Sequence, residues 1–185
     1  MLKNLRVAVK LIGGFSIVVL LGLAIGIVGM SNMADLSDMN NRLYNKELLG
    51  VSYTKEANIA LVTVGRSLRS ALLATNQADR EKWVSITRQK LDETKEWMGK
   101  SSALFYTDKG KELLRKIDVA VREYEQVVNQ VIQTTLRENY LDTRASLDML
   151  ADLAKKGNIA DDLMTDASNQ KEENAKRAAD DGAEL

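Results

Sequence analysis

The chain has 185 residues, with 26 basic and 26 acidic side chains and no proline, cysteine or histidine. An ordinary chain of this length would carry roughly nine prolines, and their absence indicates long helices because proline breaks a helix interior. Without cysteine or histidine the chain has no disulfide, no thiolate nucleophile, no histidine-based catalytic pair and no Cys/His metal site. We therefore expect a helical protein that is not an enzyme and has no cofactor and no metal.

The charge is distributed unevenly along the chain. Residues 1–10 contain Lys3, Arg6 and Lys10 and no acid, which leaves 23 basic and 26 acidic groups in residues 11–185, a net charge of −3. Nucleic-acid-binding domains usually carry a basic patch or stripe. The mildly acidic remainder therefore argues against a nucleic-acid partner.

The first predicted element is a membrane-spanning helix over residues 11–30. These twenty residues, LIGGFSIVVLLGLAIGIVGM, contain no charge and span roughly 30 Å as a helix, the thickness of a bilayer core. A cleaved signal peptide is the alternative, but its apolar core is typically about 7–15 residues long. Because positive flanks stay inside, we expect a cytoplasmic stub over 1–10, a transmembrane helix over 11–30 and an external domain over 31–185.

Beyond the membrane segment the pattern predicts a helix from Ser31 to about residue 73. Apolar residues at multiples of seven form a coiled-coil-like stripe, which is interrupted near Gly50. Its members are Leu36, Leu43, Ala57, Val64 and Ala71. Residues 74–77 form a polar turn, and acidic residues from Asp79 onward suit the start of a second helix.

Two further breaks divide the rest of the chain. The first lies at residues 106–110, where Thr107 or Asp108 is a suitable N-cap. The second is predicted at residues 155–158, where two lysines and Gly157 resemble a helix C-terminus. The third helix would then be much longer than the second, unless it breaks near residues 139–142.

The fourth predicted helix begins near residue 159. Its end, residues 168–185, is strongly polar and indicates a solvated or frayed helix outside the core. Four helices with short polar connections predict an all-α fold, an antiparallel up-down four-helix bundle preceded by one transmembrane helix.

Three stretches of sequence together resemble a known family. They are the basic start MLKNLRVAVKLIGGFS, the segment Arg42-Leu43-Tyr44-Asn45, and residues 66–75, RSLRSALLAT. With one membrane helix before a helical domain, the chain resembles the sensory half of a bacterial methyl-accepting chemotaxis protein with a periplasmic four-helix-bundle ligand-binding domain.

The resemblance implies a homodimer in the bacterial inner membrane, with a small-molecule ligand at the membrane-distal part of the bundle. It also implies a small axial displacement of the last helix as output. A complete receptor would continue after Leu185 with a second membrane helix and a cytoplasmic region, through which kinase and adaptor contacts are made. In the family's aspartate-sensing members an arginine precedes a Met/Leu-rich turn that ends in Asn-Gln, and Arg69 before residues 72–77 matches that place. The other ligand arginines of those members have no clear counterpart, so aspartate specificity does not follow.

Five side chains are candidates for ligand contact because the up-down topology brings them to the distal end. They are Arg66, Arg69, Arg137, Tyr140 and Arg144. Guanidinium groups match carboxylates in bidentate geometry and a phenol donates to a carboxylate or hydroxyl, so we expect an organic di- or tricarboxylate. The alternative for each arginine is a solvated surface pair, such as Arg144 with Asp148 or Arg137 with Glu138 or Asp142.

Two other functions fit the same pattern. The helical stripe equally suits a membrane-tethered coiled-coil interaction protein that binds no metabolite. A histidine kinase sensor would differ only in the sequence that follows Leu185.

Overall fold

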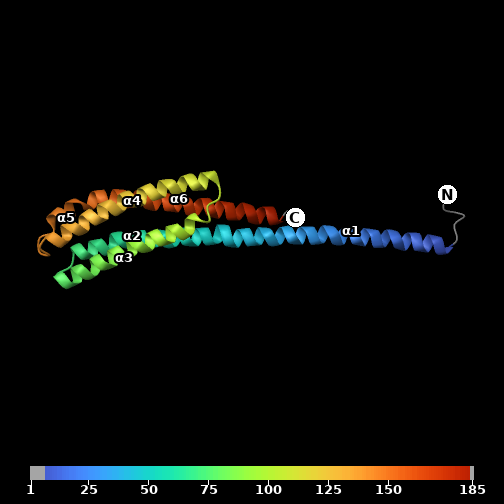
Figure 1. Cartoon of the computed structure of the whole chain (residues 1–185), viewed down its shortest axis with the longest axis horizontal. Coiled ribbons are helices and arrows are strands. Elements are labelled where there is room, and N and C mark those ends of the chain that lie inside the picture. The colour runs from blue at the N-terminus through green and yellow to red at the C-terminus, as the bar shows by residue number, and fades with distance from the viewer. Residues whose placement is uncertain (1–6, 184–185) are drawn as a thin grey trace.

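The structure is a computed structural model that describes residues 7–183, and one very long helix dominates it. α1 (Val7–Arg42), the π-helical segment η2 (Leu43–Leu48) and α2 (Leu49–Leu72) follow one another without a break. Figure 1 shows α1 extending far beyond the other helices. Residues 11–30 lie in this extension with every side chain exposed, and among the described residues this is the one helix long and apolar enough to cross a membrane. Lys3 and Arg6 lie outside the described residues.

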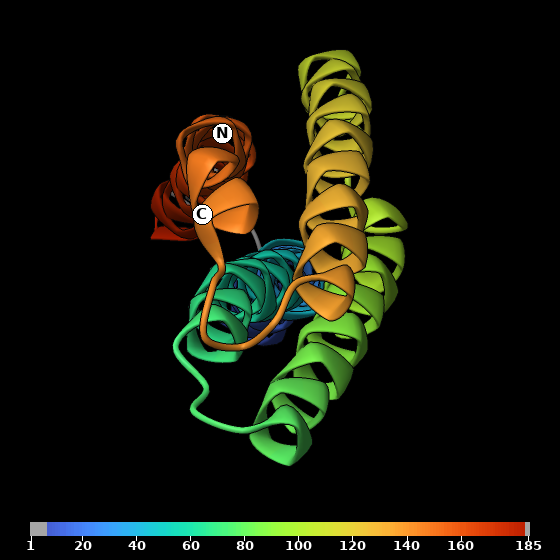
Figure 2. The same ribbon diagram turned by 90° about the vertical axis from the view of Figure 1, so that its left-hand side faces the viewer.

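The other helices fold back beside α2. They are α3 (Gln77–Ser102), α4 (Asp108–Arg137), the short α5 (Arg144–Asp148) and α6 (Leu150–Ala183). Seen along the bundle, α2, α3, α4 and α6 surround one core (Figure 2). α2 packs most extensively on α3, and α6 packs on both α2 and α4. The predicted antiparallel four-helix bundle after one long apolar helix is confirmed.

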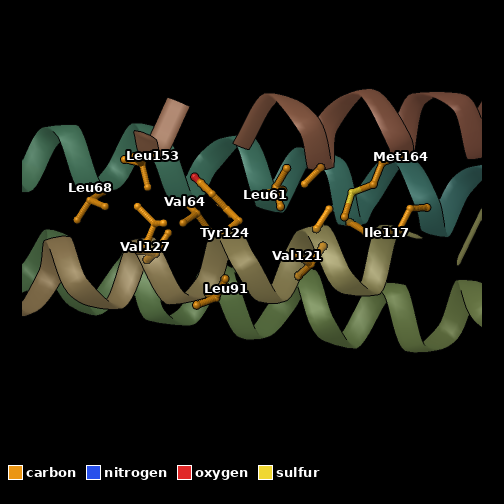
Figure 3. Close-up of a cluster of buried hydrophobic side chains, with 14 of the residues drawn as sticks. Leu61, Val64, Leu68, Leu91, Ile117, Val121, Tyr124, Val127, Leu153 and Met164 are labelled. Atoms are coloured by element: carbon orange, nitrogen blue, oxygen red, sulfur yellow. The ribbon is translucent and has the colours of Figure 1, made fainter. Parts of the chain in front are cut away.

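The core is a column of aliphatic side chains between these four helices (Figure 3). It includes Leu61, Val64 and Leu68 of α2, Leu91 of α3, Ile117, Val121 and Val127 of α4, and Leu153 and Met164 of α6. The heptad stripe of the sequence contributes to this column, because Ala57, Val64 and Ala71 are completely buried inside the protomer. The part of the stripe that lies in α2 therefore reports internal packing, whereas Leu36 of α1 is 42% exposed.

Two of the predicted helix starts are confirmed by their caps. The side chain of Asn76 accepts a hydrogen bond of 2.8 Å from the backbone N–H of Asp79. The Thr107 hydroxyl accepts one of 3.1 Å from the N–H of Gly110. Each cap pairs a backbone donor at a helix start that has no intrahelical partner, so it fixes where α3 and α4 begin.

The predicted break at residues 155–158 is wrong, because α6 runs through it. α4 instead ends at Arg137, and the chain turns over residues 138–143. The third helix is therefore not much longer than the second. Gly157 lies inside α6 and faces the ring of Tyr124, where a Cβ would lie 3.1 Å from Cε2. The glycine permits close helix approach, which a single sequence does not distinguish from a C-cap.

The polar C-terminal stretch is also more ordered than expected. α6 continues to Ala183, and Ser168, Lys171 and Ala175 are buried in it. They pack against η2 and the end of α1, which lie beside this part of α6. The expectation that residues 168–185 stay outside the core is wrong for this face of the helix.

The interruption predicted near Gly50 has a different form from a break. The helix continues, but six residues before Gly50 form the π-helical η2. A Cβ on Gly50 would lie 2.9 Å from Cε of Lys171. Glycine at this position therefore makes room for the buried lysine of α6.

Candidate ligand-binding site

The five predicted ligand-contact residues fall into two separate groups. Arg66 and Arg69 are on α2, whereas Arg137 ends α4, Tyr140 lies in the following turn and Arg144 begins α5. All five side chains are exposed. Arg69 alone of the five lines the cavity between α2, α4 and α6.

The surface pairs considered for the turn do not form among the described residues. Glu138 instead accepts hydrogen bonds from the backbone N–H groups of Ala145, at 2.7 Å, and Ser146, at 3.2 Å. It therefore caps α5, whose short length leaves its N–H groups dependent on such a side chain. Arg137 and Arg144 are left facing solvent.

The cavity beside Arg69, here called the lateral cavity, has a volume of about 100 Å³. α2 provides one wall, α6 the other, and Tyr124 of α4 the floor. Its polar groups are Arg69, Tyr124, Asn158 and Asp161. The remaining lining is apolar or glycine: Leu61, Val62, Gly65, Leu153, Ala154 and Gly157.

Two glycines hold the Tyr124 side chain in place. A Cβ on Gly65 would lie 3.1 Å from the Tyr124 hydroxyl and 3.7 Å from Nη1 of Arg69, while Gly157 faces the other part of the ring. Tyr124 is only 3% exposed, and Figure 3 shows its oxygen directed toward α2 and α6 from among the core residues. The phenol and the guanidinium thus meet beside Gly65.

The cavity is lined by one positive side chain, Arg69, one negative side chain, Asp161, and the phenol of Tyr124. Burial raises the pKa of Tyr124 to about 12, and the nearby Arg69 charge opposes that rise. The hydroxyl is therefore a neutral donor near pH 7 and forms no hydrogen bond within the described part of the chain. The Tyr124 oxygen is not one of the buried polar atoms without a partner among the described residues, so it opens into the cavity. A carboxylate there would find two donors, Tyr124 and Arg69.

Sequence reasoning missed the three other polar residues of this cavity, Tyr124, Asn158 and Asp161. Tyr124 fits the apolar face of its helix, Asp161 is one of a pair of acids in a polar stretch, and Asn158 was assigned to a turn. The available signal was a glycine inside each of two helices, Gly65 and Gly157, because such glycines often mark close packing. That signal locates the contact but does not reveal which side chain it accommodates.

A further buried cation lies at the end of the bundle far from α1. Arg80 of α3 is completely buried and its Nη1 donates to the carbonyls of Thr135, at 2.9 Å, and Glu138, at 2.6 Å. Thr135 is in the last turn of α4 and Glu138 is its C-cap residue, so both carbonyls lie where acceptors have no intrahelical donors. Arg80 therefore joins the start of α3 to the end of α4, and Nε and Nη2 keep no partner among the described residues.

Comparison with known proteins agrees with the fold. A family model described as a four helix bundle sensory module for signal transduction matches residues 4–185. One similar solved structure is a periplasmic sensor domain of a sensor histidine kinase, at 16% identity and a TM-score of 0.63, covering 80% of this chain and 93% of that chain. No curated protein matches the chain. At this identity the solved structure supports the fold alone.

Proposed function

The chain belongs to the family of four-helix-bundle sensory modules for signal transduction, and on that premise we propose that it is the sensory part of a bacterial chemoreceptor. The family is a sensory and not a catalytic one, so the proposal requires a binding site and a route for the signal. We propose that the lateral cavity is the site and that α6 is the route. The proposed homodimer would place two such modules side by side.

The proposed topology puts residues 1–10 in the cytoplasm, 11–30 in the inner membrane and 31–185 in the periplasm. The exposed apolar stretch of α1 supports the span, and the periplasmic origin of the structural relative supports the location of the bundle. The absence of cysteine makes a direct test available. Asn76→Cys should react with a membrane-impermeant maleimide in intact cells, and Lys10→Cys only after permeabilisation; the reverse pattern would overturn the topology.

The observation that carries the ligand proposal is the unpartnered Tyr124 hydroxyl beside Arg69. Both groups donate, so they suit one carboxylate of a small organic acid. Asp161 opposes a second carboxylate inside the cavity, so the rest of a di- or tricarboxylate would extend outside it. Arg66, Arg137, Tyr140 and Arg144 do not line the cavity; ligand contact by these residues stays a separate prediction that the lateral-cavity proposal does not require.

A thermal-shift screen of the full chain in nanodiscs tests the ligand class. Mono-, di- and tricarboxylates are compared with amides of the same carbon skeletons, and hits are titrated by calorimetry. A ligand at 100 times its dissociation constant should stabilise the fold by about 2.7 kcal/mol. Carboxylates should raise the melting temperature where the amides do not, and no shift across the panel would favour an interaction protein without a metabolite.

The same titration separates the cavity from the far end of the bundle. If the cavity is the site, Arg137→Ala and Arg144→Ala should retain the affinity for a hit carboxylate. Loss of binding in those two variants with an unchanged circular dichroism spectrum would move the site to the turn after α4.

Signal output is the second part of the proposal. α6 lines the lateral cavity with Asn158 and Asp161 and then continues beside η2 and α1 to Ala183. A ligand that draws α6 toward Arg69 would move its far end relative to the membrane helix. We propose that this axial displacement is the signal.

A sensor of a histidine kinase is the second candidate, because one similar solved structure has that origin. The two candidates share the cavity and the output helix and differ in the cytoplasmic domain that reads the displacement. Fusing residues 1–185 to a chemoreceptor signalling domain or to a kinase domain, each through its own second membrane helix, compares them. Ligand-dependent output from only one of the fusions identifies the function.

The proposed homodimer would require a contact surface outside the bundle core. α2 exposes two large apolar residues, Ile59 at 60% and Val62 at 36%. They lie beside Arg66 in a shallow surface hollow. Ile59→Cys should give a disulfide-linked dimer in membranes, whereas Arg88→Cys, exposed on α3, should not.

A further inference from the structure

A buried ion pair joins the last helix to the first one. Glu47 of η2 and Lys171 of α6 are each 1% exposed, and Nζ lies 3.1 Å from Oε2. The pair is ten residues beyond Asp161 along α6, which is about 15 Å of helix. It is therefore separate from the lateral cavity.

Polar partners surround this pair on several sides. The Lys171 ammonium also donates to the carbonyls of Leu104, at 2.6 Å, and Lys46, at 3.1 Å. The Tyr106 hydroxyl donates to Oε1 of Glu47 at 2.6 Å and accepts from Nη2 of Arg42 at 2.8 Å. We call these residues, Arg42, Lys46, Glu47, Leu104, Tyr106 and Lys171, the ion-pair cluster.

The backbone around the cluster has a π-helical turn and a glycine that makes room for the buried lysine. Lys46 and Glu47 lie within η2, whose π-helical turn is a feature that often marks functional sites. Gly50 leaves space for the lysine stem, since a Cβ there would lie 2.9 Å from Cε. The ring of Phe105 lies 4.7 Å from Nζ, and Tyr106 lies 5.1 Å from it. Four parts of the chain, η2, α2, the α3–α4 connection and α6, thus converge on one ammonium group.

We infer that the Glu47–Lys171 pair fixes the axial register of α6 against the first helix and thereby makes the output two-state. Helix shifts in signalling proteins are about 1–2 Å. Because the lysine stem is confined beside Gly50, such a shift along α6 would lengthen or misalign the hydrogen bonds from Nζ to the two carbonyls. The displaced lysine would then be a buried charge with fewer partners, and Glu47 would keep only the hydrogen bond from Tyr106. Such a loss of the buried charge pair is unfavourable.

Apolar packing would have a less directional effect. Apolar contacts are non-directional, whereas hydrogen bonds weaken steeply with distance and angle, so the polar cluster defines one position more sharply. Because apolar pairs of equal volume are often as stable as buried ion pairs, the polar cluster points to positional control. The inference rests on the proposed function in that α6 carries the signal, but the register itself needs no ligand.

Disulfide formation in the full chain in nanodiscs measures the register, because the chain has no cysteine of its own. A Cβ on Gly182 of α6 would lie 3.4 Å from Cε of Met39 and 3.6 Å from Cδ1 of Leu36. The ratio of the intramolecular cross-linking rates of Met39→Cys/Gly182→Cys and Leu36→Cys/Gly182→Cys therefore reports the position of α6 along α1. No ligand is added.

Lys171→Met keeps the stem and removes the charge, so α6 should shift against α1 and the rate ratio should change from its wild-type value. The matched control is Arg80→Met, which also removes a fully buried cation but at the far end of the bundle. Arg80→Met should leave the ratio unchanged. An unchanged ratio in Lys171→Met, or an equal change in both variants, would overturn the inference.

Two more variants separate register from stability. Glu47→Gln has nearly the same shape and replaces Lys171→Met as the probe if that variant does not fold. Glu47→Leu/Lys171→Met should regain the wild-type melting temperature while its ratio stays altered; a ratio that returns with stability would mean that the pair is only structural. Since these measurements use no ligand, a failed carboxylate screen would not affect them.

Discussion

The lateral cavity and the ion-pair cluster are built from the same kinds of residue and differ in how they are satisfied. Each has a tyrosine, a basic side chain, a carboxylate and a glycine that makes room. In the cluster Tyr106 is bonded to both Arg42 and Glu47, whereas the Tyr124 hydroxyl in the cavity has no partner in the described chain. In the cluster the polar groups are enclosed with one another, and Glu47 Oε2 is held by the ion pair alone. In the cavity the donors face an opening that a ligand could occupy.

The largest expected effect comes from breaking the ion pair. Lys171→Ala leaves Glu47 buried without a cation, and such losses are about 3–5 kcal/mol. Glu47→Leu/Lys171→Met should lie within about 1–2 kcal/mol of wild type, because an apolar pair of similar volume is often neutral. Urea unfolding followed by circular dichroism gives both values. Equal losses in the two variants would show that the cluster is not acting as a charge pair.

Alkaline pH should destabilise the cavity side of the bundle through Tyr124. Its pKa is raised from 10.0 to about 12, so the folded state keeps a proton that the unfolded state releases. The corresponding stability is fully present below pH 10 and is lost between pH 10 and pH 12, in total about 2–3 kcal/mol. Tyr124→Phe should lack this part of the loss. Parallel pH profiles of wild type and variant would contradict the buried phenol.

Filling the cavity should reduce binding more than stability. Gly65→Ala puts a methyl group 3.1 Å from the Tyr124 hydroxyl, and one methyl group in a binding pocket changes affinity by about tenfold or more. The control is Gly99→Ala on α3, where the Cβ would have nothing within 4 Å. Gly99→Ala should retain the affinity and gain up to about 1 kcal/mol of stability. Calorimetry with a hit carboxylate distinguishes the two.

The smallest effect is expected at an exposed ion pair between α2 and α6. Lys55 and Glu172 lie 2.6 Å apart, but their side chains are 56% and 51% exposed. Removing Lys55 with Lys55→Ala should change the unfolding free energy by about 0.2–1 kcal/mol. A loss as large as that of Lys171→Ala would show that contact between α2 and α6, and not burial, determines the strength of these pairs.

Most of the fold follows from local pattern. The polar turn at 74–77, the cap at Thr107 and the stripe through Ala57, Val64 and Ala71 depend on neighbours in sequence, and they were predicted correctly. The membrane span at 11–30 stays a prediction. The break at 155–158 was predicted wrongly, because Gly157 packs against Tyr124, a residue 33 positions earlier in the chain.

The site was less predictable for the same physical reason. Arginines at helical spacing indicated where cations face solvent, and Arg69 proved to line the cavity. Its partners Tyr124 and Asp161 come from two other helices, and their meeting depends on how α4 and α6 pack. The ion-pair cluster gave almost no local signal, because a lysine in the polar stretch 168–185 resembles any solvated residue until η2 is placed beside it.

Calorimetric titration of a hit carboxylate into wild type, Arg69→Gln and Arg88→Gln tests the central claim most directly. Arg88 is an exposed arginine of α3 and serves as the charge-matched control. Because a hydrogen bond to a charged group contributes about 1.5–3 kcal/mol, Arg69→Gln should weaken binding about 10- to 100-fold while Arg88→Gln binds as wild type. Equal affinity in all three proteins would contradict a binding site at the lateral cavity.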